Sequence, residues 1–225
     1  MNVLVFDIET VPDIKGARNI WNIHDLSEED IKSFLSTSRL QDTSGRTDFL
    51  KHHLHKIVSI SVAIRNKDTF KLWSLGEESS SENELLERFF SGVEKYEPTL
   101  ISWNGNGFDL PVIHYRALVN QVKSSIYWET GTDRREFKFN NYLSRYHQRH
   151  LDLMDILSGY NANAYARLDE IACMCGFPGK MGLSGGEVSV KYSNGKISEI
   201  RNYCETDVLN TWLVYLKFEF IRGKL

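Results

Sequence analysis

The first strand of the chain constrains the fold most, because it joins an uninterrupted apolar run to two acids. Residues 3–6 read VLVF, and a short run of this kind is typical of a strand that is covered on both faces. Asp7 and Glu9 follow at once. Residues i and i+2 of a strand point to the same side, so we expect the two carboxylates to project side by side. Such a pair suits a hard divalent cation such as Mg²⁺ or Mn²⁺, although a strand that runs into a solvated loop would explain it as well.

Strands and helices alternate after this first strand. Residues 57–64 alternate apolar and polar side chains, which is the pattern of a half-buried strand. Residues 150–157, HLDLMDIL, fit a strand or a helix, and the polar segment 13–56 is the hardest to interpret, although Ser27 with Asp30 indicates a short helix there. Further strands are expected at 69–75 and 99–103, and helices after Ser81, from Asp109 and over 197–221. This order favours a single α/β domain over residues 1–225, with a mixed sheet flanked by helices.

The composition is that of an ordinary water-soluble protein of 225 residues, 41% of them hydrophobic. No apolar run approaches the roughly 20 residues that span a bilayer, and the first strand leaves no room for a targeting signal, so a cytoplasmic location is expected. The net charge of −3 argues against a protein that coats nucleic acid over its whole surface, but it allows a local basic track. Cys173, Cys175 and Cys204 lack the spacing of a zinc site and are expected to be small buried side chains of helices.

Two later segments place further acids at helical positions. In residues 102–111, SWNGNGFDLP, a strand ends and Asp109 stands near a helix start, where capping alone would explain it. In residues 203–212, YCETDVLNTW, Tyr203 and Asp207 are four residues apart and share one helix face. Tyrosine and aspartate are also common at the edge of a buried face, so neither segment by itself identifies a site.

Taken together, FDIET, WNGNGFDLP and YCETD resemble the three-motif signature of the DEDD 3′-to-5′ exonucleases, in the branch with tyrosine in the third motif. The chain is similar in particular to the proofreading exonuclease domain of family B DNA polymerases and to stand-alone bacterial predicted exonucleases related to it. Trp103 replaces the usual tyrosine of the second motif, which Asn104, Phe108, Asp109 and Pro111 otherwise match. The resemblance spans nearly the whole chain and is weakest over residues 13–56.

The resemblance implies a ribonuclease H-like fold and a metal-dependent enzyme that shortens nucleic acid, preferably single-stranded DNA, from a free 3′ end to nucleoside 5′-monophosphates. It implies two divalent ions, Mg²⁺ or Mn²⁺, about 4 Å apart, held by Asp7, Glu9, Asp109 and Asp207. Tyr203 would orient the attacking water, since a phenol with an ordinary pKa of about 10 is a poor base at neutral pH. The implied contacts to the terminal nucleotide are Thr10, Asn104 and Phe108.

Basic and histidine-rich segments give weaker indications. Residues 137–151, FKFNNYLSRYHQRHL, interleave basic residues with aromatics and contain no acid, which suits a surface that tracks phosphates and stacks bases, or equally a solvated face. The basic residues concerned are Lys138, Arg145 and Arg149, and Lys180 is a further candidate phosphate contact. The histidines of HHLH, residues 52–55, are expected to lie at the surface, because nothing nearby completes a ligand set for a transition metal.

Alternative functions stay open at this point. A phosphatase of the haloacid dehalogenase type also places two acids after a strand, but it requires Asp where this chain has Glu9, and it leaves the later motifs unexplained. An exoribonuclease would use the same metal centre and would differ in how it treats the 2′-hydroxyl. A non-catalytic nucleic-acid-binding module would be expected to have lost a metal-binding acid, whereas all four are present.

Overall fold

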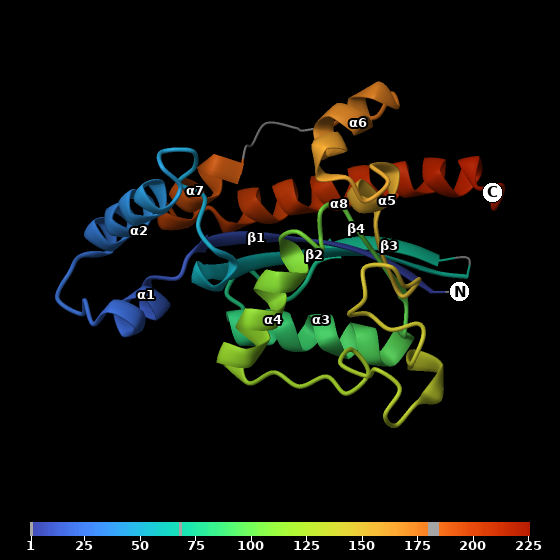
Figure 1. Ribbon diagram of the computed structural model, residues 1–225, viewed down its shortest axis with the longest axis horizontal. Helices are drawn as coiled ribbons and strands as arrows, with labels where there is room; N and C mark the ends of the chain where they lie inside the picture. Colours follow the sequence, from blue (N-terminus) through green and yellow to red (C-terminus); the bar gives the residue numbers. More distant parts are fainter. Residues whose placement is uncertain (1, 68, 180–184) are drawn as a thin grey trace.

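The computed structural model describes residues 2–67, 69–179 and 185–225, which form a five-stranded mixed sheet with helices on both faces (Figure 1). The strand order is β3-β2-β1-β4-β5. β2 pairs antiparallel with β1 and β3, whereas β4 pairs parallel with β1 and β5. The strands are β1 (Val3–Pro12), β2 (His55–Asn66), β3 (Thr69–Ser74), β4 (Thr99–Ser102) and β5 (His150–Asp152). The α/β class with a mixed sheet, predicted from the sequence, is confirmed.

Two of the helices begin directly after the serines that the sequence predicts as caps. Ser27 and Ser81 each accept a hydrogen bond from the backbone N–H three residues on, at 3.2 Å, although the helix after Ser27 is longer than expected. The helices are α1 (Ile14–Trp21), α2 (Glu28–Asp42), α3 (Glu82–Tyr96), α4 (Asp109–Asn120), α5 (Leu153–Leu157), α6 (Leu168–Met174), α7 (Val188–Ser193) and α8 (Ile197–Ile221). Short 3₁₀ turns lie at His52–Leu54, Arg135–Phe137, Ala162–Ala164 and Gly185–Glu187.

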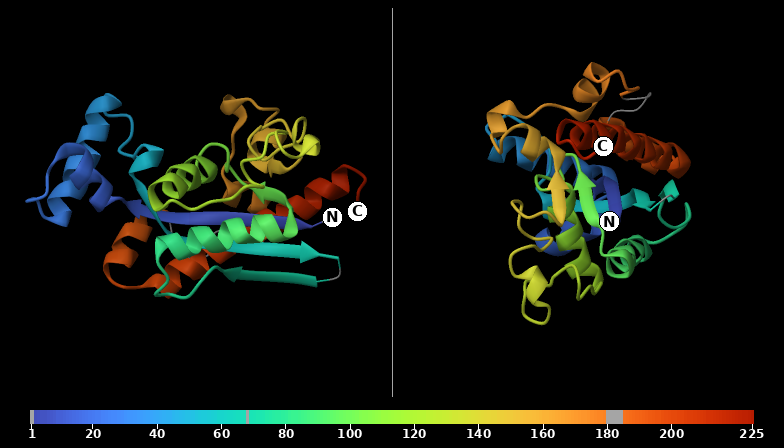
Figure 2. Two further views of the ribbon diagram at one scale, coloured as in Figure 1. Left: turned by 90° about the horizontal axis from the view of Figure 1, so that it is seen from below. Right: turned by 90° about the vertical axis from the view of Figure 1, so that its right-hand side faces the viewer.

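The side chains of β1 alternate between two hydrophobic cores, one on each face of the sheet. Leu4, Phe6 and Ile8 pack with α3 and α4, and the Phe6 ring lies 5.3 Å from that of Phe89. Val3 and Val5 face the other way and pack with α8. Figure 2 shows the same arrangement, with α8 on one side of the sheet and α3 on the other. The first strand is therefore covered on both faces, as its apolar run predicted.

The prediction that residues 57–64 form a half-buried strand was wrong in one respect. These residues form the middle of β2, but Ser59 and Ser61 on its polar side are only 1% and 0% exposed. The cause is α8, which packs across β2 and removes that face from water. Ser61 is satisfied there by a hydrogen bond of 2.8 Å between its hydroxyl and that of Ser74. The ambiguous residues 150–157 divide into β5 and α5.

The cysteine and histidine predictions hold only in part. Cys204 is buried, but Cys173 is exposed and Cys175 half-buried, because α6 rests on the outside of α8 and keeps one face in solvent (Figure 1). Among the histidines of residues 52–55, His55 is only 6% exposed, since its ring bonds to Thr10 and to the carbonyl of Leu50. None of the helices formed by the described residues has the length and apolar character that a membrane crossing requires.

Candidate active site

Asp7 and Glu9 lie inside β1, since the strand continues beyond them to Pro12. Its pairing with β2 is regular as far as Glu9 and shifts register between Glu9 and Thr10. Glu9 is only 9% exposed and Asp7 is half-buried, and a carboxylate oxygen of each lies within 4.8 Å of the other. The expectation that the two carboxylates share one side of the strand is therefore confirmed.

Asp109, the first residue of α4, is bonded directly to the strand that carries the first two acids. Its side chain accepts a hydrogen bond from the backbone N–H of Ile8 at 3.2 Å, and the residue is 4% exposed. Ile8 stands between Asp7 and Glu9. This single bond therefore fixes the N-terminus of α4 beside both of them.

The long helix α8 is oriented by residues on the side away from the acids. Arg201 donates to the backbone carbonyls of Ser74 and Gly76 at 3.1 and 2.9 Å, and Glu205 accepts from the Ser74 N–H at 2.8 Å. Both contacts hold α8 at the end of β3. Tyr203 and Asp207 lie on a different side of the helix, and Asp207 lines the cavity with the acids of β1 and α4.

The acids form one electrostatic unit. Burial, followed by the charges of Asp109, Asp207 and Glu9, raises the pKa of Asp7 well above its ordinary value. Burial also raises the pKa of Asp109 to about 7. All four carboxylates line one cavity of about 660 Å³. Carboxylate oxygens that repel one another across a cavity match the donor set that Mg²⁺ and Mn²⁺ prefer.

A thiol adjoins this group of acids. The ligand atoms of Asp7, Glu9 and Cys204 all lie within 4.8 Å of one another. The Cys204 thiol donates to the Asp7 carboxylate at a sulfur–oxygen distance of 3.5 Å. Burial, followed by the charges of Asp7 and Glu9, raises the pKa of this thiol well above its usual value, so it stays protonated at neutral pH.

The loop before α4 is shaped by an acid that the sequence did not single out. Asp152 at the end of β5 accepts hydrogen bonds from the backbone N–H groups of Asn104 and Asn106, both at 2.9 Å. Asn104 adopts the left-handed conformation, with φ of 63°. A side chain on Gly107 would meet the Asn104 carboxamide oxygen at 2.2 Å, so glycine permits this close approach. The sequence offered one signal for this role, because Asp152 stands where a strand could end. The signal was not decisive, since residues 150–157 fitted either a strand or a helix.

Only some of the residues predicted to contact the substrate line the cavity with the acids. Asn104 and Phe108 line the cavity with the acids, whereas Thr10 is not among the described residues that do so and bonds to His55 Nδ1 at 2.9 Å. The cavity is also lined by Trp103, Met154 and residues 165–170. Among the described lining residues, Arg167 is the one with a positive charge. Lys180 lies outside the described residues.

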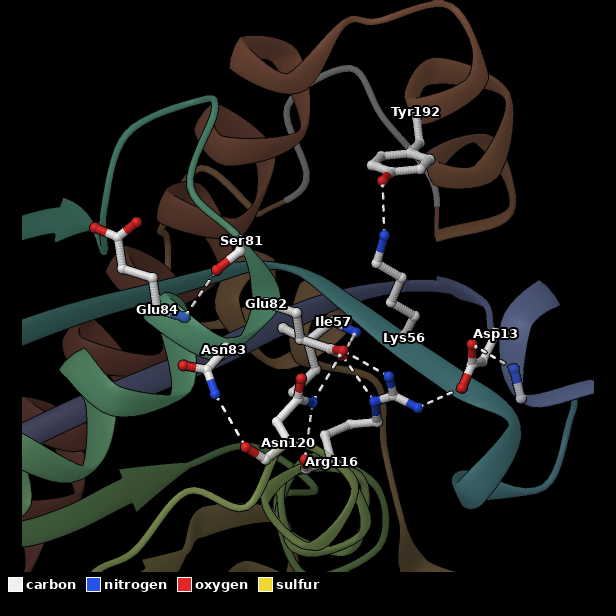
Figure 3. A network of polar contacts seen from close by, with 11 residues as sticks. Asp13, Lys56, Ile57, Ser81, Glu82, Asn83, Glu84, Arg116, Asn120 and Tyr192 are labelled. Atoms are coloured by element: carbon white, nitrogen blue, oxygen red, sulfur yellow. Dashed lines mark hydrogen bonds and ion pairs between the residues drawn. The ribbon is translucent and has the colours of Figure 1, made fainter. Parts of the chain in front are cut away.

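A buried network of charges holds α4 against the rest of the site (Figure 3). Arg116 of α4 forms ion pairs with Glu82 at 2.5 Å and with Asp13, and the exposed fraction of each of the three side chains is between 6 and 8%. Glu82 also accepts the backbone N–H of Ile57 on β2 at 2.6 Å, and Asp13 caps α1 through the N–H of Gly16. The network joins α1, β2, α3 and α4 beside Pro12, the last residue of β1.

A mixed sheet whose central strand presents acids to further acids on flanking helices is the arrangement of a ribonuclease H-like exonuclease. A family model described as a predicted 3′-5′ exonuclease related to the exonuclease domain of PolB matches residues 47–225. The chain therefore belongs to this family. The matched part contains Asp109, Tyr203 and Asp207, while Asp7 and Glu9 precede it.

Two curated relatives are similar to the chain. They are the catalytic subunits A of DNA polymerase epsilon from Emericella nidulans and from Aspergillus fumigatus, each 25% identical over 143 residues. The similarity covers 61% of this chain and 6% of each relative. The chain thus corresponds to a small part of these long proteins.

Proposed function

We propose that this chain removes nucleotides one at a time from the 3′ end of single-stranded DNA and releases nucleoside 5′-monophosphates. The observation that carries the proposal is the cavity lined by Asp7, Glu9, Asp109 and Asp207, which come from three separate segments. Burying like charges together is costly unless cations compensate them, so an arrangement of this kind favours a functional site over a structural one.

The metal ions would be held by these four carboxylates. Two divalent ions, Mg²⁺ or Mn²⁺, balance four negative charges and supply, when bound, an acidified water and stabilisation of the leaving 3′-oxygen. Asp109 is bonded to Ile8 N–H through one carboxylate oxygen, and an ionised carboxylate has about four lone-pair sites, so it keeps acceptor capacity for an ion. The protonated thiol of Cys204 would donate to Asp7 rather than replace it as a ligand.

Tyr203 is proposed to position the attacking water. Burial, followed by the charges of Asp207 and Glu9, raises the pKa of its phenol above the ordinary value, so the hydroxyl keeps its proton at neutral pH. A protonated phenol donates hydrogen bonds and cannot serve as the general base. Its contribution is therefore the orientation of a water and of Asp207, with which it shares a helix face.

The substrate contacts are proposed on the cavity walls. Asn104 and Phe108 adjoin the acids, Thr10 follows Glu9 on β1, and Arg167 offers a charge for a phosphate. DNA is preferred in this proposal because the two relatives are DNA polymerase subunits. A duplex end would have to unstack before entering, at a cost of a few kcal/mol. The single domain over residues 1–225 and the cytoplasmic location stay predictions.

The test is an end-labelled degradation assay with DNA and RNA strands of one sequence. We expect Mg²⁺ or Mn²⁺ to support stepwise shortening of the 5′-labelled DNA strand, and excess chelator to abolish it. A 3′-blocked strand is the matched control and should survive. Full activity in chelator, or equal activity on the blocked strand, would refute the proposal, whereas faster cleavage of the RNA would reassign the substrate to an exoribonuclease.

A further inference from the structure

Next to the acidic cavity lies a surface that the cavity itself does not include. Tyr165 lines the cavity and donates its hydroxyl to the Asp155 carboxylate at 2.5 Å. Arg145 forms an ion pair with the same carboxylate at 2.7 Å. The Asp155 side chain is only 3% exposed, while that of Arg145 is 40% exposed. A buried anion thus holds an accessible cation directly beside the cavity wall.

Two tyrosines surround this cation. The Arg145 guanidinium lies 5.8 Å from the ring centre of Tyr146 and 5.6 Å from that of Tyr160. The two rings are themselves 5.1 Å apart. Tyr146 is 66% exposed and Tyr160 is 41% exposed. Large rings gathered around an arginine and open to solvent are the composition of a surface that stacks bases and contacts phosphates.

The backbone of Tyr160 is held in an unfavourable conformation. Its φ is 61°, in the left-handed region that a bulky side chain rarely adopts. The backbone N–H of Tyr160 donates to the Asp155 carbonyl oxygen at 2.7 Å and so closes the turn after α5. Strain of this kind persists where the surrounding structure imposes it, and it gathers at functional surfaces.

The neighbouring basic residue Arg149 serves the fold instead. Its guanidinium lies 3.7 Å from the ring centre of Phe137, and its Nε donates to the Asn140 carbonyl at 2.8 Å. The Arg149 side chain is 16% exposed. Two basic residues of the segment 137–151 therefore have different surroundings: Arg149 packs within the fold, and Arg145 adjoins the cavity.

We propose that Arg145, Tyr146 and Tyr160 bind the nucleotides that precede the terminal one on a single-stranded substrate. This inference rests on the proposed function of the cavity. Bases would stack on the two exposed rings, and Arg145 would contact the phosphate between them, because its ion pair with Asp155 leaves other N–H groups available. Only an unpaired strand offers free base faces, so this surface would add to the preference for single strands.

The test compares the wild type with a Tyr146→Ala/Tyr160→Ala variant on two substrates. One is the p-nitrophenyl ester of thymidine 5′-monophosphate, which has a terminal nucleotide and none before it, and the other is a DNA strand of about ten nucleotides, a length within single-strand site sizes. We expect the variant to lose at least about fivefold in kcat/KM on the longer strand, since each stacked base contributes that much or more. The rate on the ester should not change. Phe220→Ala, at an aromatic residue 67% exposed near the end of α8, is the matched control and should leave both rates unchanged.

A second measurement separates the surface from the chemistry. Fluorescence anisotropy with the longer strand in chelator reports binding without cleavage, and the double variant should bind at least about fivefold more weakly than the wild type. Tyr146→Phe/Tyr160→Phe keeps both rings and should bind like the wild type. Tyr146→Ala alone carries the test if the double variant does not fold. Equal affinities of the wild type and the double variant would overturn the proposed surface even if the enzyme cleaves. If the wild type does not cleave but the double variant binds more weakly as expected, only the proposed function is overturned.

Discussion

Replacing Arg116 with methionine should destabilise the protein strongly. The change keeps most of the side-chain volume but leaves the carboxylates of Asp13 and Glu82 without their cation, in positions where their side chains are 8 and 7% exposed. Removing one partner of a buried ion pair costs about 3–5 kcal/mol. Bonds from Ile57 N–H, Gly16 N–H and Asn120 persist and limit the loss, so we expect about 4 kcal/mol.

The measurement is urea unfolding followed by circular dichroism, with the free energy of unfolding extrapolated to water. Arg88→Met is the matched control, because the pair of Arg88 with Glu84 is exposed and its loss should change the midpoint little. A triple variant, Arg116→Met with Asp13→Asn and Glu82→Gln, removes the uncompensated charges and should recover at least half of the lost stability.

Two outcomes would refute this reasoning. A loss below about 1 kcal/mol for Arg116→Met would mean that water or protonation relieves the two acids at little cost. A triple variant no more stable than the single variant would mean that the packing of Arg116, rather than its charge, holds α4. Either result would also weaken the view that this network positions Asp109, which begins the same helix.

Further predictions concern the site itself. Asp207→Ala should lose metal binding in calorimetry and nearly all single-turnover cleavage, whereas Tyr203→Phe should keep the metal and lose roughly 10²-fold in rate; a silent Tyr203→Phe would refute only the role of the tyrosine. Because the pKa of Asp109 is raised to about 7, its proton competes with the metal below that pH. Affinity for Mn²⁺ should therefore rise from pH 6 to 8, and an affinity that does not change with pH would contradict the assignment of Asp109 as a metal ligand. The free energy of unfolding of the metal-free protein should fall as the pH rises from the pKa of Asp109 in the unfolded state to about 7. Gly107→Ala should raise KM more than it lowers kcat, because the new methyl group would displace the Asn104 carboxamide.

Local patterns in the sequence were sufficient for several of the elements and for the shared side of Asp7 and Glu9. The bounds of α8 and the start of α4 at Asp109 follow from side-chain periodicity and from residues near the helix start, which act over a few positions. The spacing of Asp7 and Glu9 also fixes their shared side without any tertiary contact. These features could be predicted because their causes lie within one turn or one strand.

Other features depend on partners far away in the chain and could not be predicted. Ser59 is buried because α8 covers β2, and Cys173 is exposed because little covers α6. Asp152 shapes the loop of Asn104 only through the parallel pairing of β4 with β5. The different contacts of Arg145 and Arg149 likewise come from the folding of one irregular segment, in which basic residues look alike in sequence.

The orientation of the third motif shows how distant contacts set the geometry of the site. Arg201 and Glu205 are four residues apart on α8 and are bonded to the end of β3. Tyr203 and Asp207 have the same spacing but are offset by two residues, so they lie about 200° around the helix from the first pair. Attaching one pair to the sheet edge therefore turns the other pair away from it, toward the cavity that Asp207 lines. The acid of α8 faces those of β1 because the helix is held from its other side.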